Sequence, residues 1–200
     1  DDRPSLWDAW DVEPSILETG RDCIPATRCN IKSPGPLRAE IVFQRSIGKN
    51  SSMTQTIRLD ADSRRLEFDC EVDWREQHQL LKVLFPTLVR SDRATFEMPF
   101  GFAERPTHCN MAADAAQYEV PGHRWADLSE PGFGLALLTD CKYGFSVSRG
   151  VLALSLLRAP TYPDEHCDVG KHQFSYAIVP HQGDWRKGEV VSEATAFNQP

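Results

Sequence analysis

Histidine and cysteine are the residues of this sequence that could bind a transition metal. They occur in three short groups with neighbouring acids: His108 and Cys109, then His123 and Asp127, then His166, Cys167 and His172. Structural zinc sites space their ligands closely and regularly, as in C-x₂-C or H-x₃-H, because four ligands must converge on one ion. None of the three groups has this spacing. The sequence therefore predicts no metal bound by this chain.

Paired carboxylates are the second candidate, because a glycosidase needs two carboxyl groups across the scissile bond. Glu67, Asp69, Glu71 and Asp73 alternate with apolar residues. Alternate residues of a strand point to the same face, so these acids should share one solvated surface rather than a catalytic site. The sequence also has no G-x-S-x-G nucleophile motif and no glycine-rich phosphate loop. We therefore expect no catalytic residue in this chain.

Tryptophans in expected loops are the third candidate. Trp7 and Trp10 lie beside acids near the start of the chain, and Trp125 lies within the segment 123–127, between two strand regions. Exposed indole rings stack on sugars, and neighbouring Arg and Asp side chains can bond sugar hydroxyls. The same three residues could equally fill a core, as we expect for Trp74. Both roles stay open from sequence.

The elements that must position these residues are strands. Residues 66–74 alternate strictly between apolar and acidic side chains, a period of two that is typical of a strand with one buried face. Further strands are predicted at 37–47, 54–59, 80–86, 95–100, 133–139, 151–157 and 172–180, each bounded by turn residues. Many short strands separated by turns predict an all-β sandwich or barrel.

Details of several segments refine this prediction. The dense apolar runs 80–86 and 151–157 should be central strands covered on both faces. Gly150 should supply a positive φ in a hairpin turn before the second run. Residues 111–116 are rich in alanine but too short for a stable helix, so we expect a loop with one helical turn.

Composition limits the classes of ligand and the compartment. The net charge is −7 and no Lys or Arg cluster could follow a phosphate backbone, which argues against nucleic acid and anionic membranes as partners. No apolar run could span a bilayer. Six cysteines occur singly, and Cys70 and Cys141 lie in apolar runs where buried thiols are expected. The cysteines favour a reducing compartment.

Several segments in fixed order resemble the C-terminal domain of family 38 glycoside hydrolases, the α-mannosidases. They are Trp7-Asp8-Ala9-Trp10-Asp11-Val12 and residues 96–108, 118–130, 135–144, 154–160 and 176–185. The resemblance runs over essentially the whole chain and is strongest to the cytosolic and bacterial branch. It implies one domain, residues 1–200, folded as a large two-sheet β-sandwich (supersandwich) of the galactose-mutarotase-like type.

The resemblance also implies that the chain is a fragment of a larger, zinc-dependent, retaining α-mannosidase that acts on terminal α-D-mannose. The zinc, its ligands and the nucleophile would belong to an N-terminal catalytic domain of the same protein, so this chain would be inactive alone. Its partners would be that domain and the α-mannoside or oligosaccharide, and the enzyme would be cytoplasmic. Severing a domain interface should leave apolar residues exposed near the start of the chain and in the loops 99–123, and a homo-oligomer could form there.

The resemblance implies three substrate-binding residues. In relatives, an arginine of the β domain lies near the sugar, and Arg105 matches it best. An aromatic residue near the start of the domain approaches the ligand, and here it would be Trp7 or Trp10. Arg105 is expected in a loop between a strand that ends near Phe100 and an irregular segment from Pro106. The alternative is a structural role, in which Arg105 pairs within the domain with Glu104, Asp127 or Glu130. Residues 109–113 depart from the usual pattern of the family, which places linkage preference in doubt.

Two other classes of protein are alternatives. A free-standing carbohydrate-binding module would need exposed aromatic residues in a row on one sheet face, whereas the aromatic residues here mostly fall on the buried phase of their strands. An aldose-mutarotase-like enzyme would need a histidine and a glutamate facing one pocket. His123 with Glu119 or Glu130 is the pair that the sequence offers.

Overall fold

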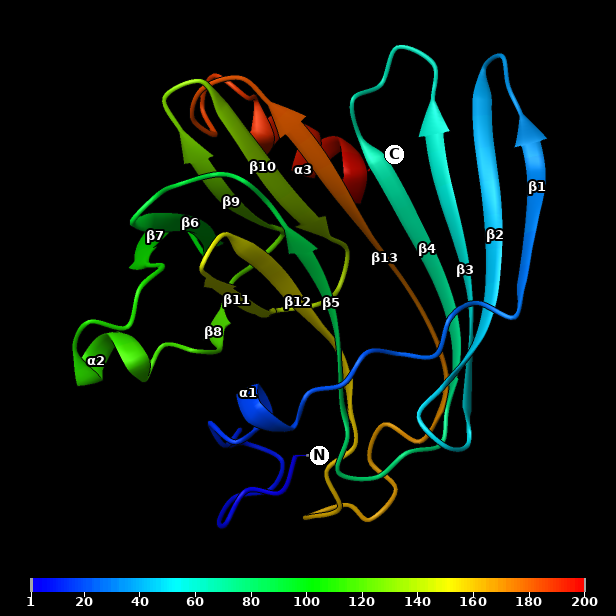
Figure 1. Ribbon diagram of the computed structural model, residues 1–200, viewed down its shortest axis with the longest axis vertical. Helices are drawn as coiled ribbons and strands as arrows, with labels where there is room; N and C mark the ends of the chain where they lie inside the picture. Colours follow the sequence, from blue (N-terminus) through cyan, green and yellow to red (C-terminus); the bar gives the residue numbers. More distant parts are fainter. Residues whose placement is uncertain (1, 200) are drawn as a thin grey trace.

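Two antiparallel β-sheets pack face to face in the computed structural model, which describes residues 2–199 (Figure 1). Within these residues the large sheet has nine strands, in the order β1 (Arg28–Pro34), β2 (Arg38–Ile47), β3 (Ser51–Asp60), β4 (Leu66–Trp74), β13 (Gly170–His181), β10 (Phe133–Thr139), β9 (Trp125–Glu130), β6 (Arg93–Met98) and β7 (Gly101–Pro106). The small sheet has four, in the order β5 (Leu80–Pro86), β12 (Val151–Arg158), β11 (Gly144–Ser148) and β8 (Val120–Pro121). The helices are α1 (Ile16–Thr19), α2 (Ala112–Ala115) and α3 (Val190–Asn198). The predicted all-β sandwich is confirmed.

Each strand that the sequence predicted is present. The alternation in β4 works as expected, because Phe68, Cys70, Val72 and Trp74 are buried between the sheets. Burial raises the pKa of the Cys70 thiol to about 11, so it stays protonated at neutral pH. The predicted hairpin joins β11 to β12, with positive φ at both Arg149 and Gly150.

The core between the sheets is built around aromatic residues from three strands. Phe68 of β4 stacks on Tyr176 of β13, with 5.0 Å between ring centroids, and Phe85 of β5 meets both rings at 5.7 and 6.2 Å. Gln55 of β3 donates a hydrogen bond to the Tyr176 hydroxyl at 2.8 Å. Phe85 thereby places the edge of the small sheet above β4 and β13.

Some predictions were wrong. Residues 80–86 form an edge strand, and Leu84 is 57% exposed, because β5 has a neighbour on one side only. Cys141 is exposed in the loop after β10, since the apolar run ends at Thr139. Strands β1, β7, β8 and β9 were missed, as was helix α3. Their short or polar sequences carry little periodicity of their own.

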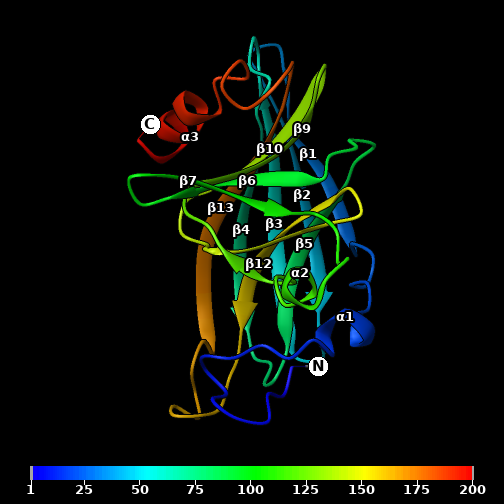
Figure 2. The same ribbon diagram turned by 90° about the vertical axis from the view of Figure 1, so that its left-hand side faces the viewer.

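Helix α3 lies on the opposite side of the large sheet from the small sheet and α1 (Figure 2). Val190 and Ala194 of the helix are fully buried and pack with Trp125 in a second, smaller core. This layer also covers His181, whose Nε2 lies 2.6 Å from the carboxylate of Asp127. The domain therefore has three layers on one half of its large sheet.

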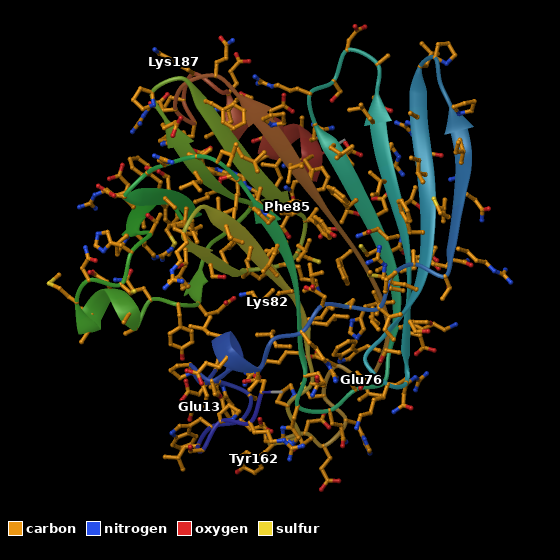
Figure 3. The ribbon with its side chains drawn as sticks, in the orientation of Figure 1. Glu13, Glu76, Lys82, Phe85, Tyr162 and Lys187 are labelled. Atoms are coloured by element: carbon orange, nitrogen blue, oxygen red, sulfur yellow. The ribbon has the colours of Figure 1, made fainter. Side chains whose placement is uncertain are left out.

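Glu76 fixes the turn between β2 and β3 from outside the hairpin (Figure 3). Its Oε1 accepts hydrogen bonds from the backbone N–H of Lys49 and Asn50, at 2.9 and 2.7 Å, and from the Ser51 hydroxyl at 3.0 Å. A Cβ at Gly48 would collide with this carboxylate. Burial alone would raise the pKa of Glu76, but these bonds outweigh it and hold the pKa below its ordinary value. The folded turn therefore stabilises the ionised form of the Glu76 carboxylate.

Replacing Glu76 with Gln should destabilise the domain by about 1–3 kcal/mol at pH 7, because charge-assisted bonds to backbone N–H groups weaken. Glu76 has a lowered pKa in the folded state, so its contribution is present above its unfolded pKa and is lost as the pH falls through the folded value. Urea unfolding at pH 7 and pH 3 measures both effects. Glu71→Gln, at an exposed position of β4, is the matched control. Equal stability of the two variants at pH 7 would contradict this role.

Candidate functional site

Trp7 and Trp10 share one tight turn near the start of the chain. The backbone N–H groups of Trp10 and Asp11 both donate to the carbonyl oxygen of Trp7, at 2.7 and 2.9 Å, and Trp7 has a φ of 59°. The two indole rings meet edge to face, with centroids 6.4 Å apart. Trp7 is 66% exposed and Trp10 is 68% exposed. The turn presents two indole surfaces to solvent, as stacking on a sugar or docking on a protein would require.

Asp8 fastens this turn to the segment after β12. Its Oδ2 accepts hydrogen bonds from the backbone N–H of Thr161 at 2.6 Å and from the Thr161 hydroxyl at 3.3 Å. The His78 ring lies 3.7 Å from the same carboxylate. Burial opposes ionisation of Asp8, but the Thr161 bonds and the His78 charge outweigh it, so its pKa lies below the ordinary value.

A second anchor lies at Arg158, the last residue of β12. Its guanidinium forms an ion pair with Asp2, which is 2% exposed, and also donates to the carbonyl oxygen of Asp11. The Tyr118 hydroxyl donates to the carbonyl oxygen of Val12. Residues 2–12 are therefore held by partners more than 100 positions away in the sequence. No local signal could have identified these anchors.

Arg105 lies in strand β7 opposite Ala94, not in the loop that the sequence suggested. Its guanidinium lies over the Phe96 ring, 4.8 Å from the centroid, and donates to the carbonyl oxygen of Pro121 at 2.8 Å. Desolvation lowers the pKa of Arg105. Within residues 2–199, Arg105 forms no ion pair with a carboxylate. The side chain is held in a fixed direction and keeps further N–H donors for another group.

The structure does not bring Arg105 together with the two tryptophans. The first residues, in dark blue, lie at the lower end of the molecule in both views, whereas β7 lies in the upper half (Figures 1 and 2). One sugar ring could not contact both places within this chain. The two parts of the expected site are separate surfaces.

Trp125 lies in the core and does not reach solvent. It lies in β9, is 2% exposed and packs against the Trp185 ring with 5.2 Å between centroids. Trp74 is also 2% exposed, as predicted. Of the tryptophans considered as sugar-stacking groups, Trp7 and Trp10 are the ones that reach solvent.

The histidine and glutamate pair expected of a mutarotase is not assembled. Glu119 accepts a hydrogen bond from the Ser155 hydroxyl at 2.5 Å, and Glu130 accepts one from the backbone N–H of Arg90 at 2.7 Å. The His123 ring instead stacks on another aromatic residue, 5.6 Å away, beside Glu97. These three side chains therefore do not face a common pocket.

A cavity of about 210 Å³ lies where the N-terminal segment meets the small sheet, lined in part by Val12, Glu119 and Arg158. Lys82 of β5, labelled in Figure 3, forms an ion pair with Glu119 and also donates to the Ser146 hydroxyl at 3.0 Å. The cavity's charged groups are therefore already engaged by the protein. No local sequence pattern marks this cluster, because its members come from five separate segments of the chain.

The three metal candidates remain apart. Within residues 2–199, no group of three or more His, Cys, Asp or Glu side chains is arranged to hold a metal ion. His108 lies 3.3 Å from Asp114, and His172 lies 2.7 Å from the carbonyl oxygen of Asp168. The residues described here do not fit the zinc that the family resemblance implies, and we assign no chemical step in this chain to it.

Apolar side chains are exposed in the two regions where the sequence predicted them. Near the start of the chain they are Leu6, Trp7, Trp10, Leu17 and Ile24, and around β7 and α2 they are Phe100, Phe102 and Met111. Among the described residues, no helix is long and apolar enough to cross a membrane. These two groups of exposed apolar side chains are candidate surfaces for contact with another protein or a ligand.

Comparison with solved structures identifies the architecture. An α-mannosidase from Enterococcus faecalis V583 superposes with a TM-score of 0.75 at 13% sequence identity, over 86% of this chain and 24% of that one. A second Enterococcus faecalis protein, described as belonging to glycosyl hydrolase family 38, gives a TM-score of 0.74 at 12% identity. At such low identity the likeness shows the fold alone. The class is that of an antiparallel β-sandwich domain found within larger proteins.

Comparison of sequences identifies the family. The profile of the glycosyl hydrolases family 38 C-terminal domain matches residues 1–166. Alpha-mannosidase 2C1 of Homo sapiens is 47% identical over all of this chain, Alpha-mannosidase G of Dictyostelium discoideum is 46% identical, and an alpha-mannosidase of Saccharomyces cerevisiae is 38% identical. The chain belongs to the glycosyl hydrolase family 38 C-terminal domain family, as the sequence segments predicted. It spans about a fifth of the length of these curated relatives.

Replacing Asp8 with Ala should release the Trp7–Trp10 turn from the segment after β12. The amide of Thr161 loses its acceptor, so its hydrogen exchange should accelerate by about tenfold or more. Hydrogen exchange with mass spectrometry measures this rate. Asp11→Ala is the control, because the Asp11 carboxylate accepts from its neighbour Val12 and not from Thr161. Unchanged exchange at Thr161 in Asp8→Ala would show that the anchor lies elsewhere.

Proposed function

We propose that this chain is the C-terminal β domain of a longer, retaining α-mannosidase that removes terminal α-mannose residues from oligosaccharides. The observation that carries the proposal is 47% identity to Alpha-mannosidase 2C1 over the whole chain, together with a chain length of about a fifth of that relative. The zinc of such an enzyme would be bound outside residues 2–199. The domain would brace the catalytic domain and help to close the sugar pocket.

The exposed apolar side chains support a bracing role. Trp7 and Trp10 protrude from a turn that is anchored by the Asp2–Arg158 ion pair and by the hydrogen bond from Thr161 to Asp8, so they are held in a fixed direction rather than left on a loose tail. A preorganised aromatic surface loses little entropy when it binds. Contact with the catalytic domain, or with an outer sugar of the oligosaccharide, suits these two rings.

Arg105 supports the pocket-closing role. Because its guanidinium is fixed by Phe96 and Pro121, the remaining donors point in a set direction and can bond two hydroxyl groups in one plane. Arg105 and the tryptophans would contact different units of the substrate, since they lie apart in this domain. We propose Arg105 for the mannose that is removed, and Trp7 or Trp10 for a more distant contact.

We also propose that the enzyme acts in the cytoplasm. The six cysteines are all unpaired, as in proteins of a reducing compartment. The sequence resembles the cytosolic and bacterial branch of the family.

The proposal predicts that activity needs more than this chain. The full-length protein should hydrolyse an aryl α-mannoside, whereas residues 1–200 alone should give no turnover and retain no stoichiometric zinc. Colorimetric assay and elemental analysis measure these properties, with circular dichroism to establish that the isolated chain is folded. An apolar docking surface left open should also make the isolated chain self-associate at high concentration. Turnover by the folded isolated chain would overturn the assignment.

Arg105→Ala in the full-length enzyme should lower kcat/KM by roughly ten- to a thousandfold, because a lost hydrogen bond to a charged group costs about 1.5–3 kcal/mol and misorientation adds to it. Arg93→Ala, on the neighbouring strand β6, is the control and should keep full activity. Thermal unfolding of both variants shows whether a loss of activity comes from unfolded protein or from lost contact with the substrate. If Arg105→Ala is fully active, or loses activity only in proportion to unfolded protein, Arg105 has a structural role alone.

A further inference from the structure

The two sheets of the sandwich do not match in width. Among the described residues the large sheet has nine strands and the small sheet has four, and the small sheet ends at β5. Figure 1 shows the small sheet in front of the left half of the large sheet, whereas β1, β2 and β3 have no strand in front of them. The segment that joins α1 to β1 crosses this region near its lower end. We call the inner surface formed by Ile31, Ile41, Ile57 and Leu59 the open face.

One row of paired residues shows where the small sheet stops covering the large sheet. Phe68 of β4 pairs with Ile57 of β3, which pairs with Ile41 of β2, which pairs with Ile31 of β1. Phe68 is 8% exposed beneath Phe85, Ile57 is partly buried, Ile41 is 37% exposed and Ile31 is 72% exposed. Exposure therefore rises step by step with distance from β5, although the side chains stay large and apolar.

The outer surface of the same strands carries charged side chains. Arg58 of β3 forms ion pairs there with Glu40, Glu67 and Asp69, three carboxylates from neighbouring strands. The open face has the reverse character, because Leu59 is 43% exposed and Phe43 is partly exposed on that side. Strands with one charged face and one apolar face have the pattern of a sheet whose apolar face is covered.

The free edge of β5 is where a cover would attach. A strand at a sheet edge presents unpaired backbone N–H and C=O groups that template another strand. Lys82 is the one charged residue of β5, and it already bonds Glu119 and Ser146. Its charge is therefore not directed against a strand that pairs with this edge. A strand about 4.8 Å beyond β5 would lie above β3, and further strands would lie above β2 and β1.

We propose that a segment from the remainder of the longer polypeptide adds strands at the free edge of β5 and packs its apolar side on the open face. The inference rests on the proposed function in one respect, that this domain is part of a longer chain. The curated relatives are about five times longer than this chain, which provides residues for such a segment. A segment of the same polypeptide also has a high effective concentration, so it would outcompete a second molecule.

Thiol labelling of the full-length protein tests the cover at two adjacent positions of β1. Ile31 lies on the open face and Asn30 on the outer face, and both are exposed in this structure. In a Cys29→Ser background, we expect the thiol of Ile31→Cys to react with iodoacetamide at least about tenfold more slowly than that of Asn30→Cys, because a covered site must open before it reacts. Equal rates at the two positions would overturn the proposal.

Photo-crosslinking identifies the occupant. A benzophenone side chain in place of Ile31 should form crosslinks within one polypeptide, to a segment outside residues 2–199, which peptide mapping by mass spectrometry would locate. Crosslinks between two molecules would overturn the proposal in favour of a dimer contact. Mannoside hydrolysis by the same preparations separates the two claims. An active enzyme with an unprotected Ile31 position contradicts the sheet extension alone, and an inactive protein with a protected position contradicts the proposed function alone.

Discussion

Strand β13 holds the two halves of the large sheet together, because it pairs with β4 along one edge and with β10 along the other. Residues Gly170 to Ile178 pair with β4, and residues Tyr176 to His181 pair with β10. Without β13, strands β1–β4 would have no backbone contact with β10, β9, β6 and β7. The family profile ends at residue 166, before this strand begins. The physical unit therefore extends beyond the matched region, since a sheet cannot lose a central strand and remain one sheet.

The same strand links the core to the outer layer. On its inner side, Tyr176 stacks with Phe68 and accepts the Gln55 hydrogen bond. On its outer side, His181 reaches Asp127 beneath the segment that leads to α3. Packing between the sheets and packing of the helix are thus coupled through one element, so a change in either layer is felt by the other.

The surfaces that we propose for substrate and domain contacts are positioned by long-range contacts. The Trp7–Trp10 turn depends on Asp8 with Thr161 and on Arg158 with Asp2, and Arg105 depends on Phe96 and Pro121. The two tryptophans and Arg105 are thus held by contacts within the domain, while part of each side chain stays accessible to another group. Such preorganised groups suit a domain that completes a site together with another part of a longer protein.

The sequence by itself determined the class of fold and the family. Alternation within β4, the turn residues between strands and the ordered segments from Trp7 to Trp185 were sufficient, because strand periodicity and the order of motifs are local properties of a chain. The tertiary structure decided what depends on distant partners. It placed Arg105 in a strand, buried Trp125 under Trp185, left β5 at an edge and exposed Ile31 on a strand that no second sheet covers. A sequence shows which residues are apolar, but whether a given face is covered depends on the number and order of strands in the opposite sheet, which no local pattern records.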